Sequence, residues 1–144
     1  MATANAATNY LERRLLHYIF KGNSLSFNSP GDSIYVGLAT AVSAAETGSV
    51  TEADFTGYQR VQVAASGWDA IGSDSTDTQT CKNNSNIEFP ASSGGGDDTI
   101  THVFIADASS GGNILFVGAL DASKTIASGD IFRINQNNLT IELK

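Results

Sequence analysis

The apolar residues near the start of the chain repeat with the period of a helix. Leu11, Leu15 and Ile19 recur every four residues, and Leu16 and Phe20 widen the same stripe. This spacing is typical of one apolar helical face. An isolated helix of this length is marginal in water, so the stripe needs a partner, either the rest of the domain or a neighbouring protein.

Residues that favour helix ends flank this segment. Asn9 is placed to cap the first turn, and Glu12 follows three residues later as in a capping box. Gly22 is placed to end the last turn. We therefore predict a helix over residues 9–21. Its polar side carries Arg13, Arg14 and His17.

From residue 33 the period changes from about four to two, which is typical of strands. The clearest signal is at residues 100–120, where two β-branched and aromatic runs flank a turn at Ser109, Ser110, Gly111 and Gly112. This pattern predicts a β-hairpin. We expect its turn to point outward and its core residues to be Val103, Ile105, Leu115 and Val117.

Shorter segments of the same kind predict further strands at 33–39, 58–64, 86–90, 124–127, 130–135 and 139–143. Residues 40–57, 67–84 and 92–98 are predicted to be loops. Strands and helices do not alternate, so a parallel sheet is not expected. The fold class predicted is mainly β: a small antiparallel β-sandwich or jelly-roll-like barrel with one N-terminal helix. Residues 1–8 would be a tail, 9–22 a docking helix and 23–144 the antiparallel β domain.

The composition of the chain excludes some classes of function. Charged residues make up only 16% of the 144 residues, and the net charge is −7. Because the eight basic residues are scattered, we exclude nucleic-acid binding. No apolar run is long enough to span a membrane. The N-terminus lacks the basic start and apolar core of a secretory signal, so we expect synthesis in a bacterial cytoplasm.

No catalytic pattern is present in the sequence. Neither His17 nor His102 lies in a nucleophile or metal-binding motif, so we expect no enzyme, metal or cofactor. Tyr58 and Trp68 are the candidates for stacking on a glycan or contacting a partner, although core packing of Trp68 is the favoured alternative. Cys81, the one cysteine, is expected to be a thiol in a polar loop, with an intermolecular disulfide as the alternative.

The order of several segments resembles the small, tail-fibre-like virion structural proteins of tailed bacteriophages. The matching segments, in chain order, are Asn-Tyr-Leu-Glu at 9–12 with Leu-Leu at 15–16 and Ile-Phe at 19–20, Ile-Tyr-Val-Gly-Leu at 34–38, Gly-Tyr-Gln-Arg-Val at 57–61, Ile-Glu-Phe-Pro at 87–90, Thr-His-Val-Phe-Ile-Ala-Asp-Ala at 101–108, Gly-Asn-Ile-Leu-Phe-Val-Gly-Ala-Leu at 112–120 and Gly-Asp-Ile-Phe-Arg-Ile at 129–134. The resemblance covers most of the chain.

The resemblance implies a non-enzymatic virion component attached at the tail fibre or baseplate through contacts with other virion proteins. A capsid cement or decoration protein is the close alternative, and a module that binds host-surface glycans is the alternative of another class. We expect a homo-oligomer, with a homotrimer favoured. The partner contacts predicted for the docking helix are Tyr10, Leu11, Arg14, Leu15 and Tyr18.

Overall fold

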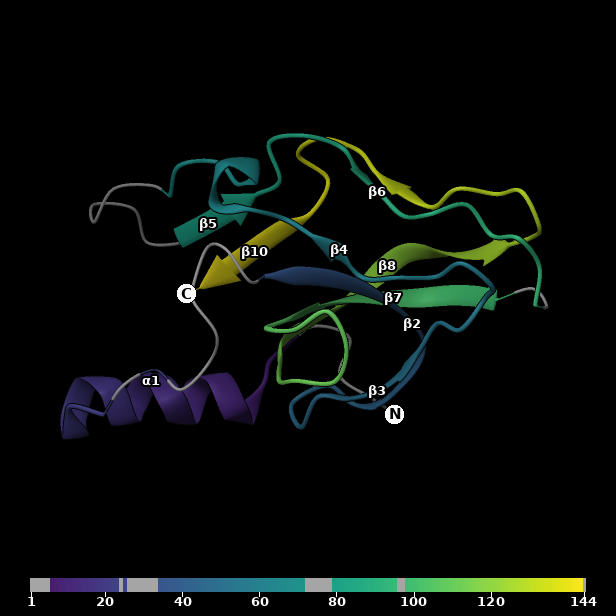
Figure 1. The fold of residues 1–144 in the computed structure, drawn as a ribbon. Coiled ribbons are helices and arrows are strands. Elements are labelled where there is room, and N and C mark those ends of the chain that lie inside the picture. The colour runs from purple at the N-terminus through teal and green to yellow at the C-terminus, as the bar shows by residue number, and fades with distance from the viewer. Residues whose placement is uncertain (1–5, 24, 26–33, 72–78, 96–97, 144) are drawn as a thin grey trace.

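A computed structural model describes residues 6–23, 25, 34–71, 79–95 and 98–143. Those residues form ten strands, one α-helix and one short 3₁₀ helix (Figure 1). The strands are β1 (Ala6–Ala7), β2 (Tyr35–Ala44), β3 (Ser49–Glu52), β4 (Val61–Gln62), β5 (Gln79–Lys82), β6 (Ile87–Glu88), β7 (Asp98–Ala106), β8 (Ile114–Ile126), β9 (Arg133–Ile134) and β10 (Thr140–Leu143). The helix α1 spans Asn9–Lys21 and the 3₁₀ helix Ala65–Gly67.

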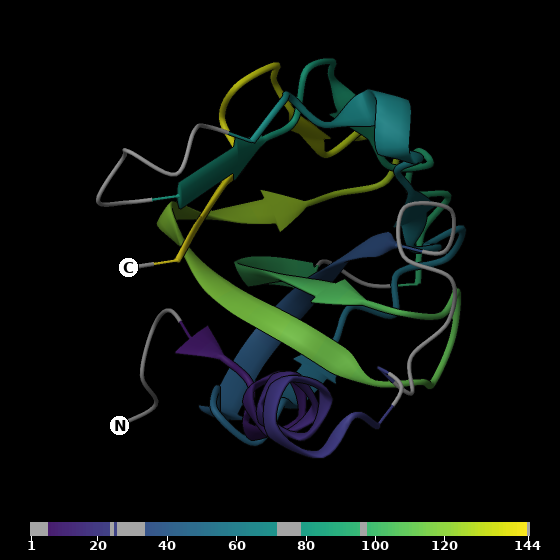
Figure 2. The ribbon, with the colours of Figure 1, turned by 90° about the vertical axis from the view of Figure 1, so that its left-hand side faces the viewer.

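The main sheet has the order β1-β8-β7-β2-β3, with β4 also paired to β2. Two small sheets, β10-β5 and β6-β9, form a second layer over it (Figures 1 and 2). Every pairing is antiparallel. The predicted mainly β, antiparallel sandwich with one N-terminal helix is therefore confirmed. The barrel alternative is wrong, because the main sheet ends at β1 and β3 and does not close.

The hydrophobic core lies on both faces of the main sheet. Between the two layers it includes Val103 and Ile105, while Phe104 and Val117 pack together on the opposite face. The predicted core residues Val103, Ile105, Leu115 and Val117 are all buried, as expected. Because both faces are covered, β7 has a continuous run of buried residues at 103–106 instead of an alternating pattern.

The hairpin predicted at 100–120 is confirmed as β7 and β8, and its turn at 109–112 is exposed. Strand β8 is longer than expected, since it continues to Ile126 and includes most of the segment predicted as a separate strand at 124–127. The predicted strands at 58–64, 86–90 and 130–135 shrink to the two-residue strands β4, β6 and β9.

Two predicted loops contain strands. The segment 40–57 holds the end of β2 and all of β3, which meet at a turn where Gly48 has a φ of +70°. The segment 67–84 holds β5, which pairs with β10 about sixty residues later in the chain. In both cases the local residues are small or polar, and the strand depends on a partner that the local pattern does not reveal.

Buried Asn83 holds the second layer together. Its Nδ2 donates to the carbonyl oxygens of Ser85 and Asn135 at 2.8 and 3.0 Å, and its Oδ1 accepts from the backbone of Leu139 at 2.9 Å. The side chain is 0% exposed. Because a buried amide is costly unless it is hydrogen-bonded, this arrangement fixes the chain that leads into β10.

Candidate functional site

The start of α1 is capped by Thr8, so the predicted Asn9 cap with Glu12 as its capping-box partner is wrong. Thr8 has extended backbone angles, φ −79° and ψ 152°, and its Oγ1 accepts a hydrogen bond from the amide of Leu11 at 3.4 Å. Asn9 is already helical. The predicted end is confirmed: Gly22 adopts a left-handed φ of +66°, and its amide donates to the carbonyl oxygen of His17.

Thr8 also ties the base of α1 to the main sheet. Its Oγ1 donates to the carbonyl oxygen of Ile114 at 2.6 Å, and its amide donates to that of Leu115 at 2.9 Å. The amide of Asn9 donates to the carbonyl oxygen of Glu46 at 2.6 Å. Immediately before Thr8 in the chain, β1 pairs with β8. Within the predicted N-terminal tail, Ala6 and Ala7 therefore form a strand of the sheet, and Thr8 is hydrogen-bonded to β8.

Replacing Thr8 with valine is expected to lower the free energy of unfolding by about 1–2 kcal/mol, because the helix cap and the bond to Ile114 are lost together. The residue is 1% exposed, and valine keeps its shape. Urea denaturation followed by circular dichroism measures the change. Thr51→Val, at an exposed position of β3, is the control and is expected to stay within about 0.5 kcal/mol of the wild type.

Beyond this anchored base, α1 presents its apolar stripe to solvent. The exposed fractions are 43% for Leu15, 56% for Leu16, 58% for Ile19 and 73% for Phe20. Figure 1 shows the helix extending from the edge of the sandwich, outside its two layers. Large apolar side chains that stay exposed as a contiguous patch mark an interaction surface. We call Leu15, Leu16, Ile19 and Phe20 the exposed stripe.

The predicted partner contacts on α1 differ in how far they are exposed. Leu15 and Tyr18 are exposed, whereas Tyr10, Leu11 and Arg14 are half-buried. The guanidinium of Arg14 lies over the ring of Tyr10 at 5.2 Å from its centroid. The residues that the predicted set omitted are Leu16, Ile19 and Phe20, although their helical spacing had already placed them on the stripe.

Charge is distributed unevenly between α1 and the rest of the chain. The helix carries Arg13, Arg14 and Lys21 against the single acid Glu12, which gives it a net charge of +2. The rest of the chain then carries −9. A basic apolar helix on an acidic body is suited to a partner surface that is apolar and acidic.

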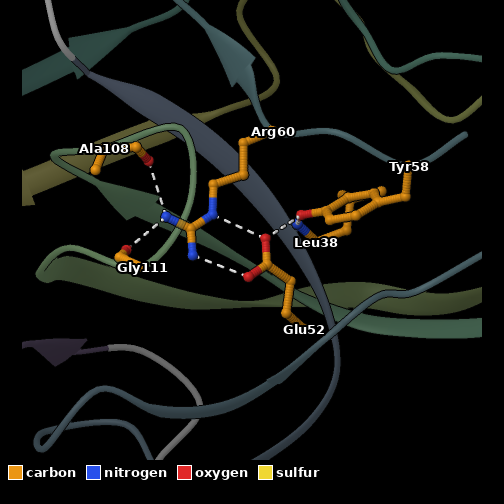
Figure 3. A network of polar contacts seen from close by, with 6 residues as sticks. All are labelled: Leu38, Glu52, Tyr58, Arg60, Ala108 and Gly111. Carbon is orange, nitrogen blue, oxygen red and sulfur yellow. Dashed lines mark hydrogen bonds and ion pairs between the residues drawn. The ribbon is translucent and has the colours of Figure 1, made fainter.

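A second polar feature holds the tip of the β7–β8 hairpin (Figure 3). Arg60 forms a two-point ion pair with Glu52, with Nε–Oε1 and Nη2–Oε2 distances of 2.8 Å. Its Nη1 donates to the carbonyl oxygens of Ala108 and Gly111 at 2.8 and 2.9 Å. One arginine thus joins β3 to the hairpin turn. All of these contacts are internal, so the network is a structural clamp.

The environment shifts the pKa of each charged partner. Burial raises the pKa of Glu52, but the hydrogen bonds from Arg60 and Tyr58 outweigh it and hold that pKa below its usual value. The hydrogen bond to Glu52 raises the pKa of Arg60. Burial raises the pKa of Tyr58 well above its usual value. The pair therefore stays ionised and the phenol stays protonated at neutral pH.

Both proposed glycan-stacking residues are half-buried and pack against the core. The Tyr58 ring stacks on Phe89 with centroids 6.3 Å apart and meets the edge of Phe55 at 5.4 Å. Its hydroxyl donates to Glu52 at 2.8 Å and accepts from the amide of Leu38 at 3.0 Å. Trp68 is half-buried and packs against the core, which was the favoured alternative. Both side chains serve the fold.

Cys81 lies in β5, so its placement in a polar loop is wrong. It is half-buried opposite Ile141 of β10. Burial raises the pKa of the thiol, and the nearby charge of Asp69 raises it further. A raised pKa lowers the thiolate fraction, which makes the sulfur a slower nucleophile.

The remaining titratable candidates form no reaction centre in the part of the chain that is described. His102 is half-buried in β7, and its Nδ1 lies 2.8 Å from the hydroxyl of the adjacent Thr101. Burial lowers the pKa of His102. Within the described residues, no group of three or more histidine, cysteine, aspartate or glutamate side chains is placed to hold a metal ion. No described helix is long and apolar enough to cross a membrane.

The chain matches a known protein family over nearly its whole length. Residues 6–142 match the family described as "Podophage GP4 fiber I protein gp80". The match runs from β1 to β10, so it includes the anchored helix, the clamp and both layers of the sandwich. No curated protein matches the chain.

Proposed function

Because the chain belongs to this family of podophage fibre proteins, we propose that it is a non-enzymatic structural component of a tailed-phage virion, attached at the tail fibre or baseplate through protein–protein contacts. The protein would be made in the bacterial cytoplasm and then joined to other virion proteins. The rest of this proposal concerns the surface that makes the contact.

The observation that carries the proposal is the combination of a fixed base and an exposed stripe on α1. Thr8 and β1 hold the base of the helix to β8, while Leu16 and Phe20 are more than half exposed. Burying each of these two side chains contributes about 1.5–3 kcal/mol. A helix whose base is fixed loses less conformational freedom on binding, so more of this energy appears as affinity.

Attachment through α1 is tested by replacing Leu16 and Phe20 with glutamate in the phage genome. The amount of this chain in purified particles is expected to fall about tenfold or more, because two charges cannot be buried in an apolar contact. Both residues are exposed, so the fold is expected to stay intact.

The matched control is the pair Ile71→Glu and Ile131→Glu, which are 66% and 52% exposed on the body of the protein. Particles carrying this control are expected to contain the chain at the wild-type level. Normal incorporation of the Leu16→Glu/Phe20→Glu chain would show that α1 is not the attachment element.

The position in the virion is tested by immunogold labelling of intact particles. We expect label on the tail. Label spread over the capsid faces would instead support the alternative of a capsid cement or decoration protein. The glycan-binding alternative is less favoured, because Tyr58 and Trp68 pack against the core.

A further inference from the structure

A groove opens between β8 of the main sheet and β10 of the second layer. Its volume is about 570 Å³. Among its lining residues are the apolar side chains of Phe116, Leu120, Leu139 and Ile141, which also pack against the core. Polar side chains line it as well, and a pocket of this size that combines apolar and polar groups is typical of a binding site.

The groove exists because β8 bends away from β7. Residues 120–123 of β8 lie opposite the single residue Thr101, between the pairs His102–Ala119 and Ile100–Lys124. Such a bulge turns the strand sharply. Across the groove, β10 pairs with β5 on its other side, and buried Asn83 fixes the chain that leads into it. Both walls are therefore held in place by the fold.

The charge of the groove is opposite to that of α1. Asp121 and Glu142 line the groove and are exposed. On α1, Arg13 and Lys21 are exposed beside the stripe that contains Leu16 and Phe20. Those two apolar side chains are four residues apart, about 6 Å along the helix axis, which is the spacing by which helices anchor in grooves.

The helix of the same chain does not fill the groove. From the N-terminal segment, Ala7 is the only described residue in the lining. Figure 2 shows α1 end-on below the main sheet, apart from the bend of β8 and the end of β10 at the left. Because Thr8 fixes the base of α1 to β8, the helix and the groove are two separate, complementary surfaces on one chain.

We propose that α1 of one copy docks into the groove between β8 and β10 of a second copy. Leu16 and Phe20 enter the apolar floor, while Arg13 and Lys21 face Asp121 and Glu142. This inference rests on the proposed function, since it names the partner of the same helix. The contact is head-to-tail, so a rotation that closes it gives a ring, of which the predicted homotrimer is one form.

The test uses three variants of the full chain, each studied by sedimentation velocity over a concentration series. The helix variant is Leu16→Glu/Phe20→Glu, and the groove variant is Asp121→Lys/Glu142→Lys. The control, Asp54→Lys/Asp69→Lys, makes the same change of charge at exposed positions outside the groove lining.

The wild type and the control are expected to self-associate alike. The affinity of self-association is expected to fall about tenfold or more in each of the other two variants. The helix variant would bury charges in an apolar contact, and the groove variant would place lysines against the basic residues of α1. A mixture of the two is expected to form a one-to-one complex, since the groove variant supplies an intact helix and the helix variant an intact groove.

Three results would overturn this inference: a wild type that stays monomeric at every concentration, a groove variant that associates as the wild type does, or a mixture that forms no complex. If the wild type is monomeric but the helix variant is lost from particles, the proposed function still holds, and the partner of α1 is a different virion protein. A helix variant that is present normally in particles would overturn the proposed attachment instead.

Discussion

Replacing Arg60 with alanine is expected to lower the free energy of unfolding by about 3 kcal/mol, because a buried charge pair loses one partner while the other stays in place. The Arg60 side chain is 5% exposed, and that of Glu52 is 33% exposed. The substitution also removes the donor to Ala108 and Gly111 and the cation over the Phe104 ring at 5.0 Å. Urea denaturation measures the loss.

The control for this prediction is Arg133→Ala. Arg133 forms an ion pair with Glu88 of the same length, 2.8 Å, but the two side chains are 49% and 47% exposed. Exposed pairs contribute about 0–1 kcal/mol, so the control is expected to cost little. Equal losses for the two variants would show that burial adds nothing to the Arg60–Glu52 pair.

The effect of Arg60→Ala is also expected to depend on pH. In the folded wild type the pKa of Glu52 lies below its usual value of 4.5. A lowered folded-state pKa stabilises the protein above the unfolded-state value, and this stabilisation is lost as the pH falls through the folded-state value. The difference between wild type and variant is therefore expected to be full at neutral pH and to shrink below about pH 4.5. A difference that stays constant into acid would contradict the role given to the Glu52 charge.

Replacing Gly37 with alanine is expected to cost about 3 kcal/mol, at the upper end for overpacking of a protein core. Gly37 lies opposite Phe104 in the pairing of β2 with β7, and a Cβ at Gly37 would fall on the Phe104 ring. The ring is 1% exposed, so it has no open space to enter. Thermal and urea denaturation measure the loss, and Ser43→Ala at an exposed position of β2 is the control.

A second substitution tests the cause of this loss. In the background of Phe104→Leu, the added methyl of Gly37→Ala is expected to cost less, because the smaller side chain vacates part of the space. Neighbouring core residues that share space couple by about 0.5–3 kcal/mol in such double-mutant cycles. Additive losses would show that contact with the ring is not what requires glycine at position 37.

The parts of the fold that could be predicted from the sequence are those that depend on residues close together in the chain. The β7–β8 hairpin and the end of α1 at Gly22 were predicted correctly, because apolar periodicity and turn-forming residues act within a few neighbours. The β2–β3 hairpin was missed because its residues are small. Ala39 and Ala45 are buried through contacts in the cluster that contains Phe104 and Val117, which come from distant strands. Strand β5 was missed because it needs β10, far along the chain.

The candidate site could also be predicted only where it depends on residues close together in the chain. The spacing of leucine, isoleucine and phenylalanine revealed an amphipathic helix, but it did not show which side of that helix the domain covers. The Thr8 cap depends on hydrogen bonds to Ile114 and Leu115, more than a hundred residues away. The clamp at Arg60 likewise depends on carbonyl oxygens of a distant turn.

The sequence by itself determined the β-rich class, the single N-terminal helix and the resemblance to phage fibre proteins, because each follows from local periodicity or from the order of short segments. Only the tertiary structure decided that Leu16 and Phe20 stay exposed, that Tyr58 belongs to the core, and that β8 and β10 enclose an acidic, apolar groove. The physical reason is that burial and charge pairing depend on contacts between segments far apart in the sequence. Those contacts are fixed by the pairing of strands in the folded protein.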